Sequence, residues 1–155
     1  MVLTIDIGNT TIGIGGFQGN KLLFIEKISS RRPLSDAGYI EKLNMILNKH
    51  GLSAEAFEGS MISSVVPSVT AVFSSALETI LGRKPLILSH KLDLGYEICT
   101  DFPEKVGCDR LADIAGAISR YSLPFVTIDL GTATTFNVLD ENLSLIHISE
   151  PTRQA

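Results

Sequence analysis

Two short segments combine a carboxylate with glycine and hydroxyl side chains directly after an apolar run. Asp6 precedes the sequence Gly-Asn-Thr-Thr at residues 8–11, and Asp129 precedes Gly-Thr-Ala-Thr at residues 131–134. Glycine lets the backbone approach a ligand closely, hydroxyl and amide groups donate to phosphate oxygens, and a carboxylate can hold a divalent cation. The pattern favours a nucleotide site. The alternative is a plain hairpin turn, because the same residue types form turns.

A third segment, residues 107–110, reads Gly-Cys-Asp-Arg and stands before the apolar positions of an expected helix. In phosphoryl transfer an aspartate such as Asp109 can orient and deprotonate a substrate hydroxyl, and an adjacent arginine such as Arg110 can clamp a carboxylate. The alternative is a capped helix, because acidic side chains are also common at helix N-termini. Glycine patterns of phosphate loops and of dinucleotide-binding turns do not occur in the sequence.

Composition and charge exclude several other classes. With 45% hydrophobic and 19% charged residues, the 155-residue chain has enough apolar material for a folded core. A net charge of −4 argues against a nucleic-acid partner. Cys99 and Cys108 are too far apart for a zinc pair and are expected to be free thiols. No leader or membrane-length apolar run is present, so we expect a cytoplasmic protein without a membrane partner.

The elements that must position these segments alternate between strands and helices. Ser35 is expected to cap a helix that ends at Gly51, and Gly82 to end a second helix that begins at Pro67. A third helix is marked by apolar Leu111, Ile114, Ala115 and Ile118. Strands are expected at residues 2–6, 12–17, 21–28, 61–66, 86–88 (a buried strand) and 124–130, around a loop-rich stretch at 95–107. The first three strands are expected to be antiparallel, which predicts an α/β domain with an antiparallel edge on an otherwise parallel sheet.

The chain begins the same element twice. Residues 3–11 align with residues 126–134 at a constant offset, and both copies lead from one expected strand into the next. We therefore predict a first domain over residues 1–123 and the first hairpin of its duplicate over residues 124–142. The carboxylates of Asp6 and Asp129 are expected to face one cleft.

Four segments together resemble the type III pantothenate kinase family of the actin-like superfamily. They are residues 6–10 (Asp-Ile-Gly-Asn-Thr), 63–67 (Ser-Ser-Val-Val-Pro), 107–110 and 129–135 (Asp-Leu-Gly-Thr-Ala-Thr-Thr), and the resemblance extends from residue 1 to about 141. It implies an actin-like ATPase (ribonuclease H-like) fold with a mixed sheet. It also implies ATP-dependent phosphorylation of pantothenate to 4′-phosphopantothenate, the first step of coenzyme A biosynthesis, by a cytoplasmic homodimer.

The resemblance also implies roles for individual residues. The ATP phosphates with their Mg²⁺ would lie against Asp6, Ile7, Gly8, Asn9, Thr10, Thr11, Ile12, Gly13 and Thr132. Asp6 would hold Mg²⁺ through the phosphates, and Asp129 would bind a monovalent cation, K⁺ or NH₄⁺. Pantothenate would be bound by Gly107, Cys108, Asp109 and Arg110, with Asp109 as the general base.

The chain departs from the family pattern at two places. Thr100 stands where the family usually has a substrate-contacting tyrosine, and Phe102 and Tyr96 are the candidates to replace it. After Asn142 the family's glycine-rich continuation is missing, so we expect residues 143–155 to be a non-native tail, poorly ordered or packed opportunistically. We also expect this chain to be truncated, inactive alone and prone to self-association. The alternatives are another small-molecule kinase of the superfamily, a non-enzymatic relative resembling transcriptional accessory factors, and an inert fragment.

Overall fold

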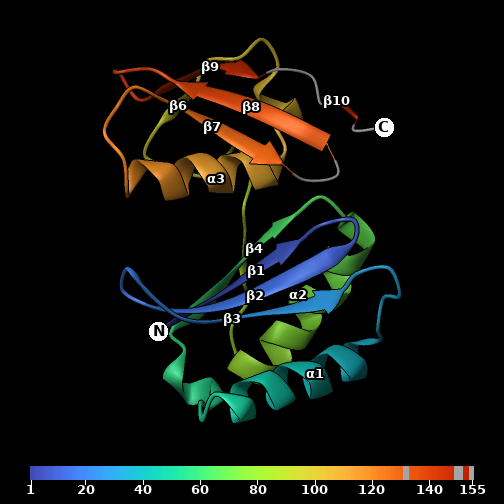
Figure 1. Ribbon diagram of the computed structural model, residues 1–155. Coiled ribbons are helices and arrows are strands. Elements are labelled where there is room, and N and C mark those ends of the chain that lie inside the picture. The colour runs from blue at the N-terminus through green and yellow to red at the C-terminus, as the bar shows by residue number, and fades with distance from the viewer. Residues whose placement is uncertain (131–132, 149–151, 154–155) are drawn as a thin grey trace. The chain divides into compact units, whose positions relative to one another are not determined.

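The chain divides into two compact units, Met1–Leu88 and Ser89–Ala155. The structure is a computed structural model that describes residues 1–130, 133–148 and 152–153 (Figure 1). The two units are defined by their internal contacts, whereas the expected domain boundary at residue 124 is defined by the sequence repeat. Because the division at Leu88 rests on a different criterion, it does not test the expected domain boundary, which stays a prediction.

The first unit is a five-stranded mixed sheet with two helices. Its elements are β1 (Val2–Ile7), β2 (Thr11–Gln18), β3 (Lys21–Ser29), α1 (Asp36–Lys49), η1 (Ala54–Ala56), β4 (Gly59–Ser64), α2 (Pro67–Leu81) and β5 (Leu86–Ile87). The strand order is β3-β2-β1-β4-β5. The first three strands pair antiparallel, and β4 pairs parallel to β1 and β5. The predicted antiparallel edge on a parallel sheet is confirmed.

Both helices of this unit begin and end at the residues that the sequence marks. The Ser35 Oγ accepts a hydrogen bond from the backbone N–H of Gly38 at 3.2 Å, which satisfies one donor of the first turn of α1. Pro67 occupies the start of α2, where its missing N–H costs nothing. Gly82 ends α2 at φ 66°, a left-handed conformation that glycine adopts without steric cost.

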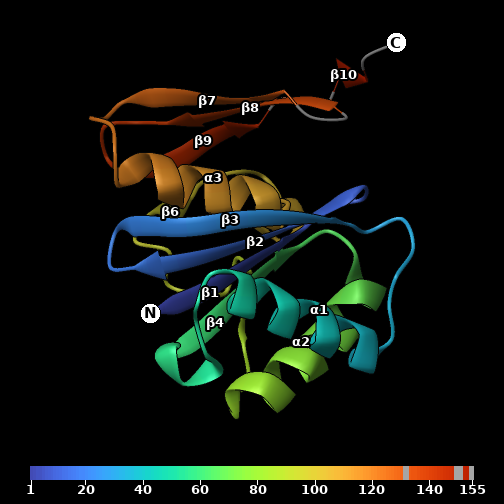
Figure 2. The ribbon, with the colours of Figure 1, turned by 60° about the horizontal axis from the view of Figure 1, so that its bottom comes forward.

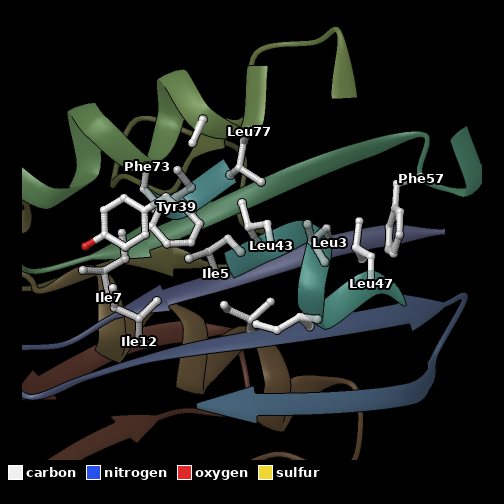
Figure 3. Close-up of a cluster of buried hydrophobic side chains, with 14 of the residues drawn as sticks. Leu3, Ile5, Ile7, Ile12, Tyr39, Leu43, Leu47, Phe57, Phe73 and Leu77 are labelled. Atoms are coloured by element: carbon white, nitrogen blue, oxygen red, sulfur yellow. The ribbon is translucent and has the colours of Figure 1, made fainter. Parts of the chain in front are cut away.

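One face of this sheet is buried beneath α1 and α2 (Figure 3). Alternate residues of β1 and β2 point into the core because side chains along a strand alternate between the two faces. The rings of Tyr39 on α1 and Phe73 on α2 meet there, with centroids 4.6 Å apart. The fully buried core side chains are Tyr39, Phe73, Leu3, Ile5, Ile7, Ile12, Ile14, Leu43, Ile62 and Leu77.

The prediction that residues 86–88 form a buried strand is wrong, because the strand that forms there has exposed side chains. Strand β5 covers only Leu86 and Ile87, and both side chains are exposed, whereas Leu88 beyond it is buried. The reason is position, because β5 is the last strand of its sheet and pairs with β4 on one side only. An apolar run alone does not distinguish an edge strand from a central one.

The second unit places one helix against one face of a second mixed sheet. Its elements are β6 (Glu97–Ile98), η2 (Pro103–Lys105), α3 (Cys108–Ile118), β7 (Phe125–Leu130), β8 (Ala133–Leu139), β9 (Ser144–Ile148) and β10 (Thr152–Arg153). The strand order in this sheet is β10-β8-β9-β6, and β7 pairs antiparallel with β8. On α3 the buried positions are Leu111, Ile114 and Ala117, whereas the predicted apolar position Ala115 is exposed.

The segment after Asn142 is part of this sheet. Strand β9 pairs antiparallel with β8 and parallel with β6, and its Leu145 is fully buried. Residues 144–148 are thus packed as a strand, and the expectation that residues 143–155 form a non-native tail stays a prediction. No helix within the described ranges has the length and apolar character needed to cross a membrane.

Candidate active site

The turn between β1 and β2 carries the first group of candidate residues. The backbone N–H of Gly8 donates to the carbonyl of Thr11 at 2.9 Å and closes the turn. Asp6 precedes it on β1, opposite Gly13 of β2 and Ser63 of β4, so all three lie on the sheet face opposite the core of the first unit. The Asp6 side chain is exposed. The strand thus presents a carboxylate directly before a tight, hydrogen-bonded turn.

Backbone hydrogen bonds hold this turn from two sides. The N–H of Ser30 donates to the carbonyl of Thr10 at 3.1 Å, and the N–H of Val65 donates to the carbonyl of Ile7 at 3.1 Å. The second bond brings the start of α2 to the same edge of the sheet. A helix N-terminus carries partial positive charge and unpaired N–H donors, both of which suit phosphate oxygens.

The residues around Asp6 fit a nucleotide with its Mg²⁺. A Cβ at Gly13 would stand 3.8 Å from the Cβ of Asp6, so its absence leaves room beside the carboxylate. The Ser63 Oγ is buried and has no hydrogen-bond partner in the described part of the chain. Within the described part of the chain, no group of three or more ligating side chains is gathered. Mg²⁺ commonly binds through one or two carboxylates plus substrate phosphates, which is the arrangement that Asp6 can support.

The start of α3 carries the second group. Gly107 is the N-cap residue of α3. As a glycine it has no side chain that could form a capping hydrogen bond. The Oδ1 of Asp109 accepts a hydrogen bond from the backbone N–H of Arg110 at 2.9 Å. The same oxygen lies where a Cβ of residue 107 would be. The Asp109 carboxylate therefore satisfies an N–H of the first turn while it remains exposed to solvent.

Asp129 lies at a pocket inside the second unit. The pocket has a volume of about 350 Å³ and is formed by α3 and β7, with Asp113, Arg120, Tyr121 and Thr127 among its lining residues. Asp113 was not singled out from the sequence. Its position four residues after Asp109, one helical turn further along α3, is the signal that could have identified it.

The two candidates for the missing tyrosine differ in their surroundings. The Tyr96 hydroxyl donates to the carbonyl of Leu111 at 3.0 Å, and burial raises the pKa of this phenol. Phe102 is exposed, and the Nζ of Lys105 lies 4.0 Å from the centre of its ring. Tyr96 is thus engaged within the unit, whereas Phe102 faces solvent close to the start of α3.

The structure groups the predicted site residues in three places. Residues 6–13 lie in and beside the β1–β2 turn, residues 107–110 form the start of one helix, and Asp129 lies at the pocket between α3 and β7. Gly131 and Thr132 lie outside the described residues. Asp6 belongs to the first unit and Asp129 to the second. Their expected meeting in one cleft stays a prediction.

Solved structures with this fold have little sequence identity to the chain. A reductive activator for a corrinoid, iron-sulfur protein matches with a TM-score of 0.54 and 13% identity, over 90% of this chain and 29% of that one. An ethanolamine utilization protein from Carboxydothermus hydrogenoformans matches with a TM-score of 0.50 and 14% identity, over 98% of this chain and 52% of that one. The predicted actin-like ATPase fold with mixed sheets is confirmed.

Sequence relatives are more specific. The chain is 36% identical over 140 residues to a type III pantothenate kinase of Thermomicrobium roseum, covering 90% of this chain and 54% of the relative. It is also 36% identical to that of Bifidobacterium animalis subsp. lactis, covering 94% of this chain and 58% of the relative. The chain thus spans a little over half the length of these relatives. A sequence profile described as type III pantothenate kinase matches residues 2–146, and the chain therefore belongs to the type III pantothenate kinase family.

Proposed function

We propose that this chain supplies the nucleotide-binding turn and the acceptor-binding helix start of an enzyme that transfers the γ-phosphoryl group of ATP to pantothenate. The product is 4′-phosphopantothenate, the first intermediate of coenzyme A biosynthesis. The observation that carries this proposal is the exposed Asp109 carboxylate beside Arg110 at the start of α3, inside the segment that matches the family.

The β1–β2 turn would hold the phosphates of ATP. Phosphate oxygens accept hydrogen bonds from backbone N–H groups, hydroxyls and helix N-termini. Such donors are available from the backbone of the turn, from Thr10, Thr11 and Thr132, and from the neighbouring N-terminus of α2. Asp6 would hold Mg²⁺ through the phosphates, and Asp129 would hold K⁺ or NH₄⁺. The metal, when bound, neutralises charge that develops on the transferred group.

Residues 107–110 would bind and activate the acceptor. The Arg110 guanidinium can pair in a bidentate manner with the carboxylate of pantothenate. Asp109 would take the proton of the primary hydroxyl of pantothenate as the oxygen of that hydroxyl bonds to the γ-phosphorus. At the same time the bond from the γ-phosphorus to the β-phosphate oxygen breaks, and ADP leaves. Such a reaction depends mainly on positioning and charge stabilisation.

We further propose that Phe102 replaces the substrate contact that the family usually makes at the position of Thr100. Phe102 is exposed, whereas the Tyr96 hydroxyl already donates to the carbonyl of Leu111. We also propose that the complete enzyme is a cytoplasmic homodimer. Because the chain spans little more than half of its relatives, we expect it to be inactive alone.

The experiment compares this chain with a chimera in which residues 1–142 are joined to the part of the Thermomicrobium roseum relative that the match does not cover. ADP release is measured with and without pantothenate, in Mg²⁺ with K⁺ and with Na⁺. We expect pantothenate-dependent ADP release from the chimera and none from the chain alone. Release that does not depend on pantothenate would be transfer to water and would contradict pantothenate as the acceptor. A chimera that binds ATP without turnover would favour a kinase with another acceptor or the non-enzymatic alternative.

A further inference from the structure

Ser63 places a buried hydroxyl group beside Asp6. The serine lies on β4, in register with Asp6 on the parallel strand β1, and both residues lie on the sheet face opposite the core of the first unit. Figure 2 shows α1 and α2 along the other side of this sheet, where the core lies. Because neighbouring strands run about 4.8 Å apart, the Ser63 hydroxyl is within reach of a group bound to the Asp6 carboxylate.

The packing of the sheet does not account for this hydroxyl. The Ser63 side chain is 7% exposed, and its Oγ has no hydrogen-bond partner among the described residues. A buried polar group without a partner destabilises a fold, and native proteins hold few such groups. Alanine would fill the same position without that cost. A ligand that meets the hydroxyl explains its presence.

A second hydroxyl on the same face is satisfied by the sheet itself. Thr4 lies two residues before Asp6 on β1, so its side chain is on the same face. The Thr4 Oγ1 donates to the carbonyl of Gly15 on β2 at 3.2 Å. Ser63 makes no such bond within the described part of the chain. The buried hydroxyl without a partner is thus the one next to the carboxylate that would hold Mg²⁺.

The surroundings of Ser63 suit a hydrated divalent cation. On the other side of Asp6, a Cβ at Gly13 would stand 3.8 Å from the Cβ of Asp6, so the glycine leaves room there. Mg²⁺ keeps several of its water molecules when it binds through a carboxylate and substrate phosphates. A serine hydroxyl has one donor and two acceptor lone pairs. It can therefore accept from such a water and donate to a carboxylate at the same time.

We propose that Ser63 is a positioning residue for Mg²⁺. Its Oγ accepts a hydrogen bond from a water molecule of the Mg²⁺–ATP complex and donates its own hydrogen to the Asp6 carboxylate. This role rests on the proposed function, because Asp6 must hold Mg²⁺ through the phosphates of ATP. The alternative is a direct hydrogen bond from Ser63 to a phosphate oxygen, which would form without Mg²⁺ as well.

Ser60 provides a matched control on the same strand. It is 6% exposed, and its Oγ also has no hydrogen-bond partner among the described residues. In the register with β1 it lies opposite Leu3, so it faces the core and not the side of Asp6. Ser63→Ala and Ser60→Ala therefore remove similar buried hydroxyls from opposite faces. Both should raise the urea midpoint of the protein, and a difference between them in ligand binding reports the face.

Calorimetric titration of ATP into the chimera defined above measures binding independently of turnover. The unchanged chimera, Ser63→Ala, Ser60→Ala and Asp6→Asn are each titrated in Mg²⁺ and in EDTA. We expect Mg²⁺ to strengthen ATP binding by the unchanged chimera and by Ser60→Ala, and Asp6→Asn to lose this effect. For Ser63→Ala we expect binding in Mg²⁺ to be about three- to tenfold weaker, the effect of one hydrogen bond, and binding in EDTA to be unchanged.

Three results would overturn this role of Ser63 and leave the proposed function in place. The first is binding in Mg²⁺ by Ser63→Ala as tight as that of the unchanged chimera, while Asp6→Asn loses the Mg²⁺ effect. The second is equal weakening in Mg²⁺ and in EDTA, which would indicate a direct phosphate contact. The third is an equal effect of Ser60→Ala. If Mg²⁺ does not strengthen ATP binding by the unchanged chimera, the proposed nucleotide site fails together with the role of Ser63.

Discussion

The carboxylate of Asp109 occupies the space that a side chain at residue 107 would fill. Its Oδ1 accepts the backbone N–H of Arg110 at 2.9 Å and lies against the position of a Cβ on Gly107. Gly107 sits at φ −62°, a conformation open to any residue, so an added Cβ there would conflict with the neighbouring carboxylate and not with the backbone conformation. The position of the proposed general base therefore depends on the absence of a side chain two residues earlier.

The substitution Gly107→Ala should displace the Asp109 carboxylate without unfolding the helix. In the chimera defined above, we expect turnover to fall by about 10²-fold, the loss that small misplacements of reacting groups can cause. Steady-state ADP release with pantothenate measures it. The matched control is Gly59→Ala at the start of β4, where an added Cβ meets nothing within 4 Å. Equal activity of the two variants would show that Asp109 is not positioned by this contact.

Much of the fold could be predicted from local patterns in the sequence. Ser35, Pro67 and Gly82 mark helix ends because capping, a missing N–H and left-handed backbone are properties of single residues. The apolar spacing of α1 and α2 identified the residues of these two helices that are buried in the core of the first unit. The exposure of Leu86 depends on strand order, which no local pattern contains.

The site could be predicted only as separate groups of residues. The segments 6–13 and 107–110 were visible because turn and helix-start chemistry is local. The pocket that joins Asp129 to Asp113, Arg120 and Thr127 was not, because it forms where α3 packs on β7. Likewise, only the structure distinguishes an engaged Tyr96 from a solvent-facing Phe102.

The protein should become more stable when Tyr39 loses its hydroxyl. The side chain is fully buried in the core (Figure 3), and among the described residues its Oη has no hydrogen-bond partner. An unsatisfied buried polar group costs about 1–3 kcal/mol, so we expect Tyr39→Phe to raise the free energy of unfolding by about 1 kcal/mol. Phe73→Ala, which opens a cavity beside it, should lower the same quantity by about 3–5 kcal/mol. Urea unfolding followed by circular dichroism measures both, and destabilisation by Tyr39→Phe would contradict the account.

Glu26 should make the stability of the first unit depend on acid pH. Its Oε1 lies 2.7 Å from Nζ of Lys49 and 2.8 Å from Nε2 of His50, and these partners lower the pKa of Glu26 from its ordinary value of 4.5. A lowered carboxyl pKa means that the stabilisation is present above pH 4.5 and is lost as the pH falls through the folded-state pKa.

The test of this prediction is the variant Glu26→Gln, compared with Glu41→Gln on the exposed side of α1. We expect the first to destabilise the chain near pH 7 and its difference from the unchanged chain to shrink as the pH falls below 4.5. The second should have little effect at any pH. Urea midpoints recorded across this range would refute the prediction if Glu26→Gln shifted them equally at pH 7 and pH 3.

Leu143 in the β8–β9 turn is strained. It has φ 61°, a left-handed conformation that costs a residue with a Cβ roughly 1–2 kcal/mol, whereas glycine adopts it freely. Because glycine also has more entropy to lose on folding, we expect Leu143→Gly to raise the free energy of unfolding by about 0.5–1 kcal/mol. Leu143→Val should lower it, since a β-branched residue is least suited to positive φ. Thermal unfolding in the opposite order would contradict this assignment.

The most direct test of the central claim is the pantothenate-dependent turnover of the chimera with Asp109→Asn. This change keeps the shape of the side chain and removes the base, so we expect turnover to fall by the 10²- to 10⁴-fold that is typical of general bases, at about unchanged stability. The control Asp36→Asn makes the same change in the first turn of α1 and should retain most of the turnover. Retention of more than about a tenth of the activity by Asp109→Asn would contradict its role as the base.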